Sequence, residues 1–278
     1  INLRALGLAI RHVKGDFADP TARGEISHFK AVATAISGTV GVGNIGGVAV
    51  AISLGGPGAA FWLFLAGLLS MSTKLVECTL GVKYRRYNAN GSVSGGPMFY
   101  LEAYFSDRGW PSLGKGMGAF YALALVIGCL GIGNMFQSNQ AYAQVLVITG
   151  GESSALVDMG WLFGLGLAAI VAAVIIGGIQ SIARVAAILV PVMALLYVVS
   201  CVVVITLSAE YLPGALQLVL SEAFTGQAAS GGALGAVIIG FQRALFSNEA
   251  GIGSASIAHA AVKTEAPTSE GITALLEP

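Results

Sequence analysis

The sequence predicts an all-α polytopic membrane protein. Hydrophobic residues make up 55% of the 278 residues, charged residues make up 10%, and the mean hydropathy is +0.80, whereas soluble domains carry roughly 25% charged residues. Uncharged stretches are also long, and the first of them extends over residues 31–73. Because about 20 apolar residues are enough for one helix to cross a bilayer, the chain can form several spans in a lipid bilayer.

Six stretches are long and apolar enough to be spans, and they are expected at residues 30–54, 58–82, 117–149, 160–180, 184–208 and 232–262. The first two are separated by Gly-Gly-Pro-Gly at residues 55–58, since Gly and Pro end helices. The third lies in an uncharged stretch that, at about 1.5 Å per residue, would exceed the roughly 30 Å hydrocarbon core. We therefore expect this helix to tilt or to extend into the membrane interface.

Basic residues mark one end of these spans. Lys and Arg occur before residue 31, between residues 74 and 115, and at Arg184 and Lys263, whereas the connections at 55–57, 149–159 and 209–231 contain neither. The positive-inside rule places the basic side in the cytoplasm. Residues 1–29 and 83–116 are therefore expected to be cytoplasmic in a protein of the cell (inner or plasma) membrane, with a short interfacial helix within 95–105.

The first span is interrupted by glycine and polar residues. Residues 37–47 read Ser-Gly-Thr-Val-Gly-Val-Gly-Asn-Ile-Gly-Gly, and irregular backbone at membrane depth is tolerated where it lines a protein cavity. The segment matches the dinucleotide fingerprint G-x-G-x-x-G, but its membrane-spanning flanks exclude a Rossmann turn. Close helix packing is the simpler alternative. The glycines spread around the helix, however, and Asn44 adds an amide, so we expect a broken helix.

The sixth span contains a second candidate break. Residues 246–251 read Phe-Ser-Asn-Glu-Ala-Gly, and they lie close to two charged residues within the span, Arg243 and Glu249. Charges inside a membrane are costly and usually functional. A structural ion pair between Arg243 and Glu249 is the alternative.

The third span carries a polar stripe. Its members fall within about 120° of one another on a helix and are expected to face the bundle interior: Asn134, Gln137, Gln140 and Gln144. Hydrogen bonds between helices would explain them at about 0.6 kcal/mol each. Gln137, nearest the middle of the span, is the candidate for substrate contact.

The two breaks occupy equivalent places in a predicted pair of repeats. Residues 30–208 would form a first repeat of five helices, and residues 232–278 would begin a second, within one transmembrane transporter domain over residues 1–278. An odd number of helices inverts the second copy, which agrees with the opposite directions of spans one and six. Inverted repeats with broken helices are typical of secondary transporters.

Other function classes find less support. The net charge of zero gives no reason to expect nucleic acid, no organic cofactor is indicated, and the three histidines are too scattered to predict a metal site. Cys78, Cys129 and Cys201 lie in apolar segments and are expected to act as small hydrophobes. A channel, the main alternative, would be expected to show repeated pore loops. An intramembrane enzyme would need an oriented pair such as Ser247 and His259.

Several long motifs resemble one family. Residues 34–48 (Thr-Ala-Ile-Ser-Gly-Thr-Val-Gly-Val-Gly-Asn-Ile-Gly-Gly-Val), 55–62 continuing to Lys74 and Glu77, 95–98 (Gly-Gly-Pro-Met) and 243–259 are similar to the alanine or glycine:cation symporters, the sodium:alanine symporter family. The chain departs from the family pattern at Val42, at Gly46 and at Leu63-Phe64. These departures are conservative or peripheral and leave the class intact.

The resemblance implies a LeuT-type fold of two inverted five-helix repeats and sodium-driven symport of small neutral amino acids. The substrate carboxylate would meet backbone amides of the opened first span, and the ammonium would meet carbonyls of the sixth span. The residues implied at the substrate site are Thr39, Gly41, Gly43, Asn44, Gln137, Phe246, Ser247 and Asn248. Those implied at a sodium site are Gly38, Asn44 and Ser247, since hard cations prefer oxygen ligands.

Family members have further helices before the first span and after the sixth. The chain is therefore expected to be a fragment with an incomplete LeuT-type fold, unable to transport alone, in which Asn44, Gln137 and Asn248 are exposed. Sodium or proton coupling, alanine or glycine, and the L or D form stay open at this point. Nothing in the sequence specifies an oligomeric state.

Overall fold

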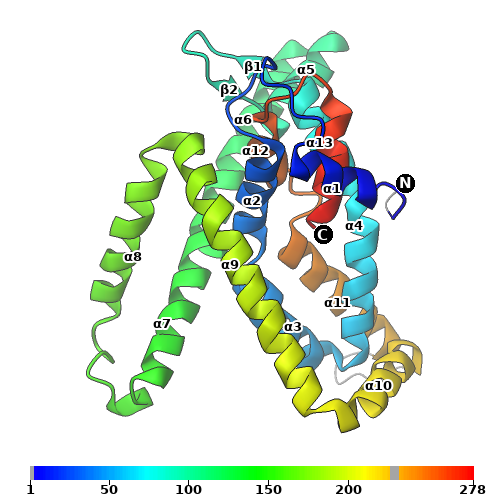
Figure 1. Ribbon diagram of the computed structural model, residues 1–278, viewed down its shortest axis with the longest axis vertical. Helices are drawn as coiled ribbons and strands as arrows, with labels where there is room; N and C mark the ends of the chain where they lie inside the picture. Colours follow the sequence, from blue (N-terminus) through cyan, green and yellow to red (C-terminus); the bar gives the residue numbers. More distant parts are fainter. Residues whose placement is uncertain (1–2, 226–231) are drawn as a thin grey trace.

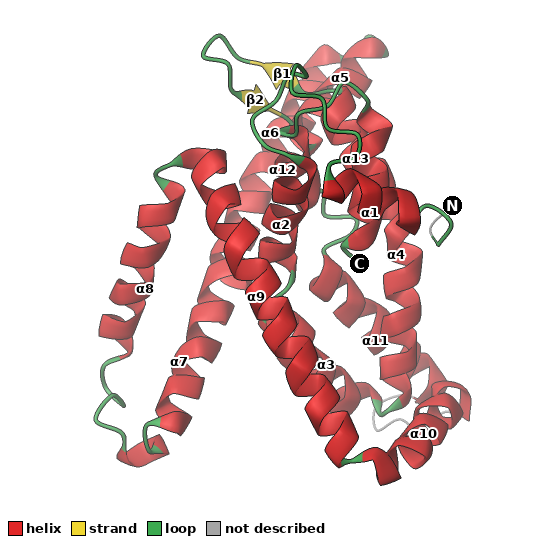
Figure 2. Cartoon of the chain, in the orientation of Figure 1, coloured by secondary structure: helices red, strands yellow, loops and turns green. Residues whose placement is uncertain are grey.

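The computed structural model describes residues 3–225 and 232–278. Residues 1–2 of the expected cytoplasmic segment and residues 226–231 of the expected connection 209–231 lie outside these ranges. Within them the chain is mostly helical, and its sheet is a small antiparallel hairpin of β1 (Arg86–Tyr87) and β2 (Val93–Ser94). Figures 1 and 2 show this helical architecture, with the hairpin at one end of the molecule.

The helices follow one another in this order: α1 (Leu6–Lys14), α2 (His28–Thr39), α3 (Val42–Gly55), α4 (Gly58–Lys83), α5 (Pro97–Asp107), α6 (Pro111–Gly128), α7 (Phe136–Ile148), α8 (Gly160–Ile175), α9 (Gly178–Leu207), α10 (Leu212–Thr225), α11 (Gly232–Asn248), α12 (Ser254–Ala260) and α13 (Pro267–Thr273). Single turns of 3-10 helix are η2 (Gly151–Ser153), η3 (Ala209–Tyr211) and η4 (Ala274–Leu276), and the π-helical segment η1 (Cys129–Met135) joins α6 to α7.

The long apolar helices identify a multi-pass membrane protein. Among the described residues, three uninterrupted helical stretches are long and apolar enough to cross a membrane: α4, residues 111–148 and α9. The bent pair α2 and α3 adds a fourth. The two other expected spans give shorter helices: α8 has 16 residues, and the sixth stretch is divided, as expected, between α11, with 17 residues, and α12, with 7.

Two predicted boundaries also move, and one predicted connection contains a helix. The third span begins at Pro111, because proline favours the first turn of a helix. The break between the fourth and fifth spans lies at Gly177 and Gly178 instead of residues 181–183, since Gly178 takes a left-handed φ of 66°. The connection 209–231, which has no Lys or Arg, contains a helix, α10, that sequence length alone did not indicate.

The buried core lies where α2, α4 and α12 meet. Ala35, Cys78 and Ala255 form one cluster with Ala274 of η4, and a side chain at Gly81 would place its Cβ 2.7 Å from the carbonyl oxygen of Ser256. Small residues of this kind let membrane helices approach closely. In Figure 1, α7 and α8 stand to one side of this core.

Candidate functional site

The first span is broken at Val40 and Gly41. Helix α2 ends at Thr39, α3 begins at Val42, and their axes differ by 43°. Side-chain amides satisfy the freed backbone: Gly41 N donates to Asn44 Oδ1 at 3.0 Å, and Val42 N donates to Gln137 Oε1 at 3.2 Å. The predicted break is confirmed, and the third span contributes to holding it open.

The second break lies between α11, which ends at Asn248, and α12, which begins at Ser254. Glu249, Gly251 and Gly253 have left-handed φ values of 54°, 93° and 88°, which stop the helix. Asn248 Oδ1 accepts a hydrogen bond from Ala250 N at 3.0 Å. This break is also confirmed at the predicted place.

Glu249 does not pair with Arg243. Its Oε2 accepts a hydrogen bond from Ser254 Oγ at 2.5 Å, and Arg243 Nε is buried with no hydrogen-bond partner in the part of the chain that the structure describes. The alternative of a structural ion pair is therefore not supported, because Glu249 contacts Ser254 at the start of α12 instead.

Asn44 joins the two breaks. Its Oδ1 accepts from Gly41 and its Nδ2 donates to Ser247 Oγ at 2.7 Å. A cavity of about 140 Å³ lies beside this contact, between the ends of α2 and α11 and the face of α4. Four predicted site residues line it, namely Thr39, Asn44, Ser247 and Asn248, together with apolar side chains such as Leu63 and Phe64.

The other predicted residues lie around this cavity. Gly43 packs against Phe246, with an ideal Cβ 2.9 Å from Phe246 Cε1. Gln137 contacts the first break from α7 and lines a second, larger cavity between α7 and α8. Gly38 is exposed near the end of α2.

Two expectations about exposure are wrong. Asn248 is buried, with 7% of its surface exposed, because α11 packs against α4 and the side chain caps the second break. Asn134 of η1 and Gln144 of α7 are exposed instead of facing the bundle interior, because among the described α-helices α7 packs mainly on α8. Asn44 and Gln137 are half-buried.

Comparison with known proteins decides the family. The chain matches the model of the sodium:alanine symporter family over residues 1–278. The chain belongs to this family. Its relatives include the sodium/alanine symporter AgcS of Methanococcus maripaludis, with 39% identity over 99% of this chain and 59% of the relative.

Other relatives of this symporter-family chain are a transporter of Haemophilus influenzae described as uncharacterized, with 38% identity over 98% of the chain and 57% of the relative, and the probable sodium/glutamine symporter GlnT of Bacillus subtilis, with 36% identity over 90% and 50%. The chain spans 50% to 59% of the length of these three curated relatives.

A buried charged cluster adjoins the cavity of this symporter-family chain. Lys74, counted above with the basic residues at one end of the spans, is fully buried and pairs with Glu277 at 3.0 Å. His259 Nε2 contacts Glu277 Oε1 at 2.5 Å, and Glu270 contacts both His259 Nδ1 and His28 Nδ1. Burial alone would raise the pKa of Glu270, but His259 and His28 more than offset it and lower the pKa.

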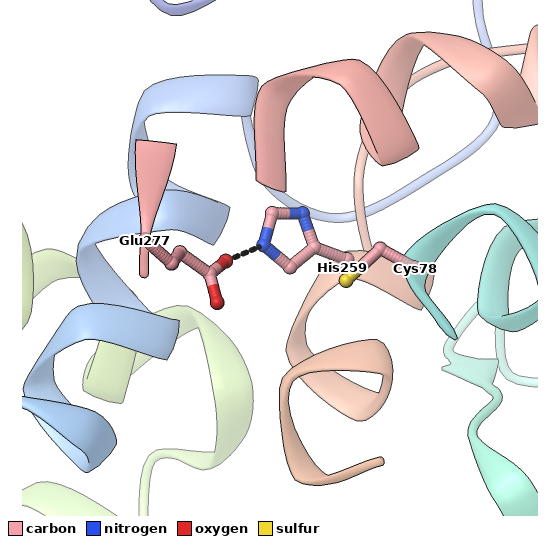
Figure 3. Close-up of side chains that lie close together, drawn as sticks. All are labelled: Cys78, His259 and Glu277. Carbon is pink, nitrogen blue, oxygen red and sulfur yellow. Dashed lines mark hydrogen bonds and ion pairs between the residues drawn. The ribbon is translucent and has the colours of Figure 1, made fainter. Parts of the chain in front are cut away.

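The residues of this cluster form a buried network of ion pairs. Figure 3 shows the carboxylate of Glu277 directed at His259, with Cys78 beside the imidazole. Ligand atoms of these three residues lie within 4.8 Å of one another. Both ring nitrogens of His259 and both oxygens of Glu277 already contact charged partners, however, and Lys74 is among them. A buried cation beside the carboxylate favours mutual neutralisation over metal binding.

Proposed function

We propose that the full-length protein is a sodium-coupled symporter of small neutral amino acids, alanine or glycine, that works by alternating access. The observation that carries the proposal is the cavity at the meeting point of two broken helices. Its polar wall consists of Thr39, Asn44, Ser247 and Asn248, with Glu277 at the edge. Transporters built on broken helices bind substrates and ions at such places.

The size of the cavity supports a small substrate. Its volume is about 140 Å³, and an engineered cavity of about 150 Å³ in another protein binds benzene. Alanine has as many non-hydrogen atoms as benzene, and glutamine has more. The volume therefore favours alanine or glycine, in line with the name of the relative AgcS, over the larger substrate in the name of GlnT.

Helix ends supply charge of both signs at the cavity. The start of α3 is a positive helix end, and the backbone amide of Gly43 in its first turn suits the substrate carboxylate. The last carbonyls of α2 and α11 have no partners within their helices. Those near Phe246 and Ser247 suit the ammonium, with Gln137 holding the first break in place.

Sodium, the proposed cargo ion, requires oxygen ligands. We assign it to Asn44 and Ser247, which line the cavity, and to the carbonyl of Gly38 near the end of α2. A proton is the alternative coupling ion. Either ion would bind next to the substrate, so that ion and substrate stabilise the same closed arrangement of the helices.

The fold belongs to the same proposal. We assign residues 30–208 to a first repeat and residues 232–278 to the start of a second, in an inverted LeuT-type arrangement. Residues 1–29 and 83–116 are assigned to the cytoplasm by the positive-inside rule. The equivalent breaks in the first and sixth stretches support the repeat.

The test is uptake of labelled alanine by the full-length protein in proteoliposomes. A sodium gradient should drive saturable accumulation, whereas a potassium gradient should not. Asn44→Ala should weaken uptake, while Ser53→Ala, an exposed position on the same helix, should not. Uptake that does not saturate would support a channel instead. Accumulation driven by a proton gradient without sodium would show that the coupling ion is the proton and not sodium.

A further inference from the structure

The chain segments that flank the two broken stretches on the basic side are joined backbone to backbone. Just before α2, the N–H groups of Glu25 and Ile26 donate to the carbonyl oxygen of Ala261 at 2.7 and 3.2 Å, and Lys263 N donates to Ile26 O at 2.8 Å. Ile26 and Val262 form a parallel bridge. The start of α2 and the end of α12 are therefore held together.

Arg85, which follows the C-terminal end of α4, gathers these segments. Its Nη1 donates to the carbonyl oxygens of Ala260 and Val262 at 3.0 and 2.6 Å, and its Nη2 donates to those of Arg23 and Thr264 at 3.1 and 2.5 Å. A guanidinium suits this task, because its planar fork directs several donors at once. One side chain thus links three parts of the chain, and we call this set of contacts the clasp.

Close packing extends from the clasp into the core. Gly81, one turn before Arg85, lies against Ser256 so closely that a Cβ would be 2.7 Å from its carbonyl oxygen. Further along α4, Cys78 is fully buried between Ala35 of α2 and Ala255 of α12. Ala274 of η4 completes this cluster, so Cys78 becomes accessible when the elements that cover it, α2, α12 and η4, move away from α4.

The clasp is distant from the cavity. Helix α2 has 12 residues, so at 1.5 Å per residue the clasp lies about 18 Å from Thr39 along this helix. Arg85 does not line the cavity. An effect of Arg85 on transport would act through the positions of α2 and α12.

We propose that Arg85 is a positioning residue of the transport cycle. Its four carbonyl contacts hold the segment before α2 against the end of α12 and the residues that follow it. They keep the cavity closed toward the basic side, and their release opens the cavity to that side. Alternating access requires such a change, because one group of helices must move against another around a fixed site. The meaning of this opening rests on the proposed function, but the contacts themselves do not involve a substrate.

The first test uses Cys78 as a reporter. The full-length protein in right-side-out and inside-out vesicles is treated with a membrane-impermeant maleimide, and labelling of the peptide containing Cys78 is measured by mass spectrometry. Arg85→Gln should raise the labelling rate from the basic side by about tenfold or more, as expected for the loss of charged hydrogen bonds. Labelling from the opposite side should not change.

Arg86→Gln is the matched control. Arg86 neighbours Arg85, carries the same charge and pairs with Glu102 at 3.0 Å, with 53% of its side chain exposed. This variant should label at the wild-type rate. Arg85→Lys keeps the charge but not the fork and should fall between wild type and Arg85→Gln. A wild-type rate in a folded Arg85→Gln variant overturns the proposal, and so does a wild-type rate in Arg85→Lys if Arg85→Gln does not fold.

The second test separates positioning from a merely structural role. Net uptake of alanine requires the empty protein to close again on the basic side, whereas exchange of internal for external alanine is assisted by bound substrate. Arg85→Gln should lower net uptake by about tenfold or more and preserve exchange. Loss of both in a folded variant overturns the proposal.

The two proposals fail in different ways. A wild-type protein that transports no amino acid, but whose Cys78 labelling responds to Arg85→Gln, refutes the transport proposal and leaves the clasp. A protein that transports alanine with unchanged labelling in Arg85→Gln refutes the clasp and leaves the transport proposal.

Discussion

Replacing Asn44 with Ala should uncouple the two helix breaks. The Asn44 side chain accepts a hydrogen bond from Gly41 N at 3.0 Å and donates one to Ser247 Oγ at 2.7 Å. One such bond contributes about 0.5–1.5 kcal/mol net, so the loss of both should cost about 1–3 kcal/mol. If the broken conformation is the one that binds substrate, this cost should weaken apparent alanine affinity roughly 5- to 150-fold.

The assay is a double-mutant cycle in proteoliposomes. Apparent alanine affinity is measured for wild type, Asn44→Ala, Ser247→Ala and the double variant, with Ser53→Ala as the control on the same helix. Because the two side chains share one hydrogen bond, the double variant should lose less than the sum of the single variants. The expected coupling is about 0.5–1.5 kcal/mol.

Additive effects would refute this reasoning. If the single losses sum to the loss in the double variant within about 0.3–0.5 kcal/mol, Asn44 and Ser247 do not act together. A wild-type alanine affinity in Asn44→Ala would show that the first break is not part of the binding site.

Three further predictions concern single positions. Gly43→Leu should abolish uptake while membrane expression persists, since even a Cβ would lie 2.9 Å from the Phe246 ring. Gln137→Ala should weaken alanine binding roughly 10- to 150-fold if Gln137 meets a charged group, and an unchanged affinity would leave it a packing role. Glu270→Gln should lower the free energy of unfolding by about 3–5 kcal/mol. Because the pKa of Glu270 is lowered, its carboxylate stabilises the fold at neutral pH, and this stabilisation is lost on acidification. The stability of the variant should therefore fall less on acidification than that of the wild type.

Local composition was enough to predict the breaks. The glycines around Asn44 and the Ser-Asn-Glu-Ala-Gly run after Phe246 are poor at continuing a helix. Each break is therefore indicated by a few consecutive residues. The left-handed backbone at Glu249 could not be predicted from the sequence, because a non-glycine residue rarely takes that conformation. The contact of Glu249 with Ser254, in place of the alternative ion pair with Arg243, could not be predicted for this reason.

Long-range contacts could not be read in the same way. His28 and Glu270 are 242 positions apart, so no spacing rule brings them together. Lys74 lies near the end of the second predicted span and its partner Glu277 follows the sixth stretch, so no local pattern indicates their pairing. Helix α10 was missed because its 14 residues fall short of the about 20 needed for a span.

The bend between α2 and α3 also bears on how fast its amide protons exchange with water. The N–H groups of Gly41 and Val42 are held by the side chains of Asn44 and Gln137 instead of by helix carbonyls. A rotamer change of either side chain frees such an amide without unwinding a turn of helix. Hydrogen exchange should therefore be fastest at these two positions within the first stretch, and α2 and α3 can change their mutual angle while each stays helical.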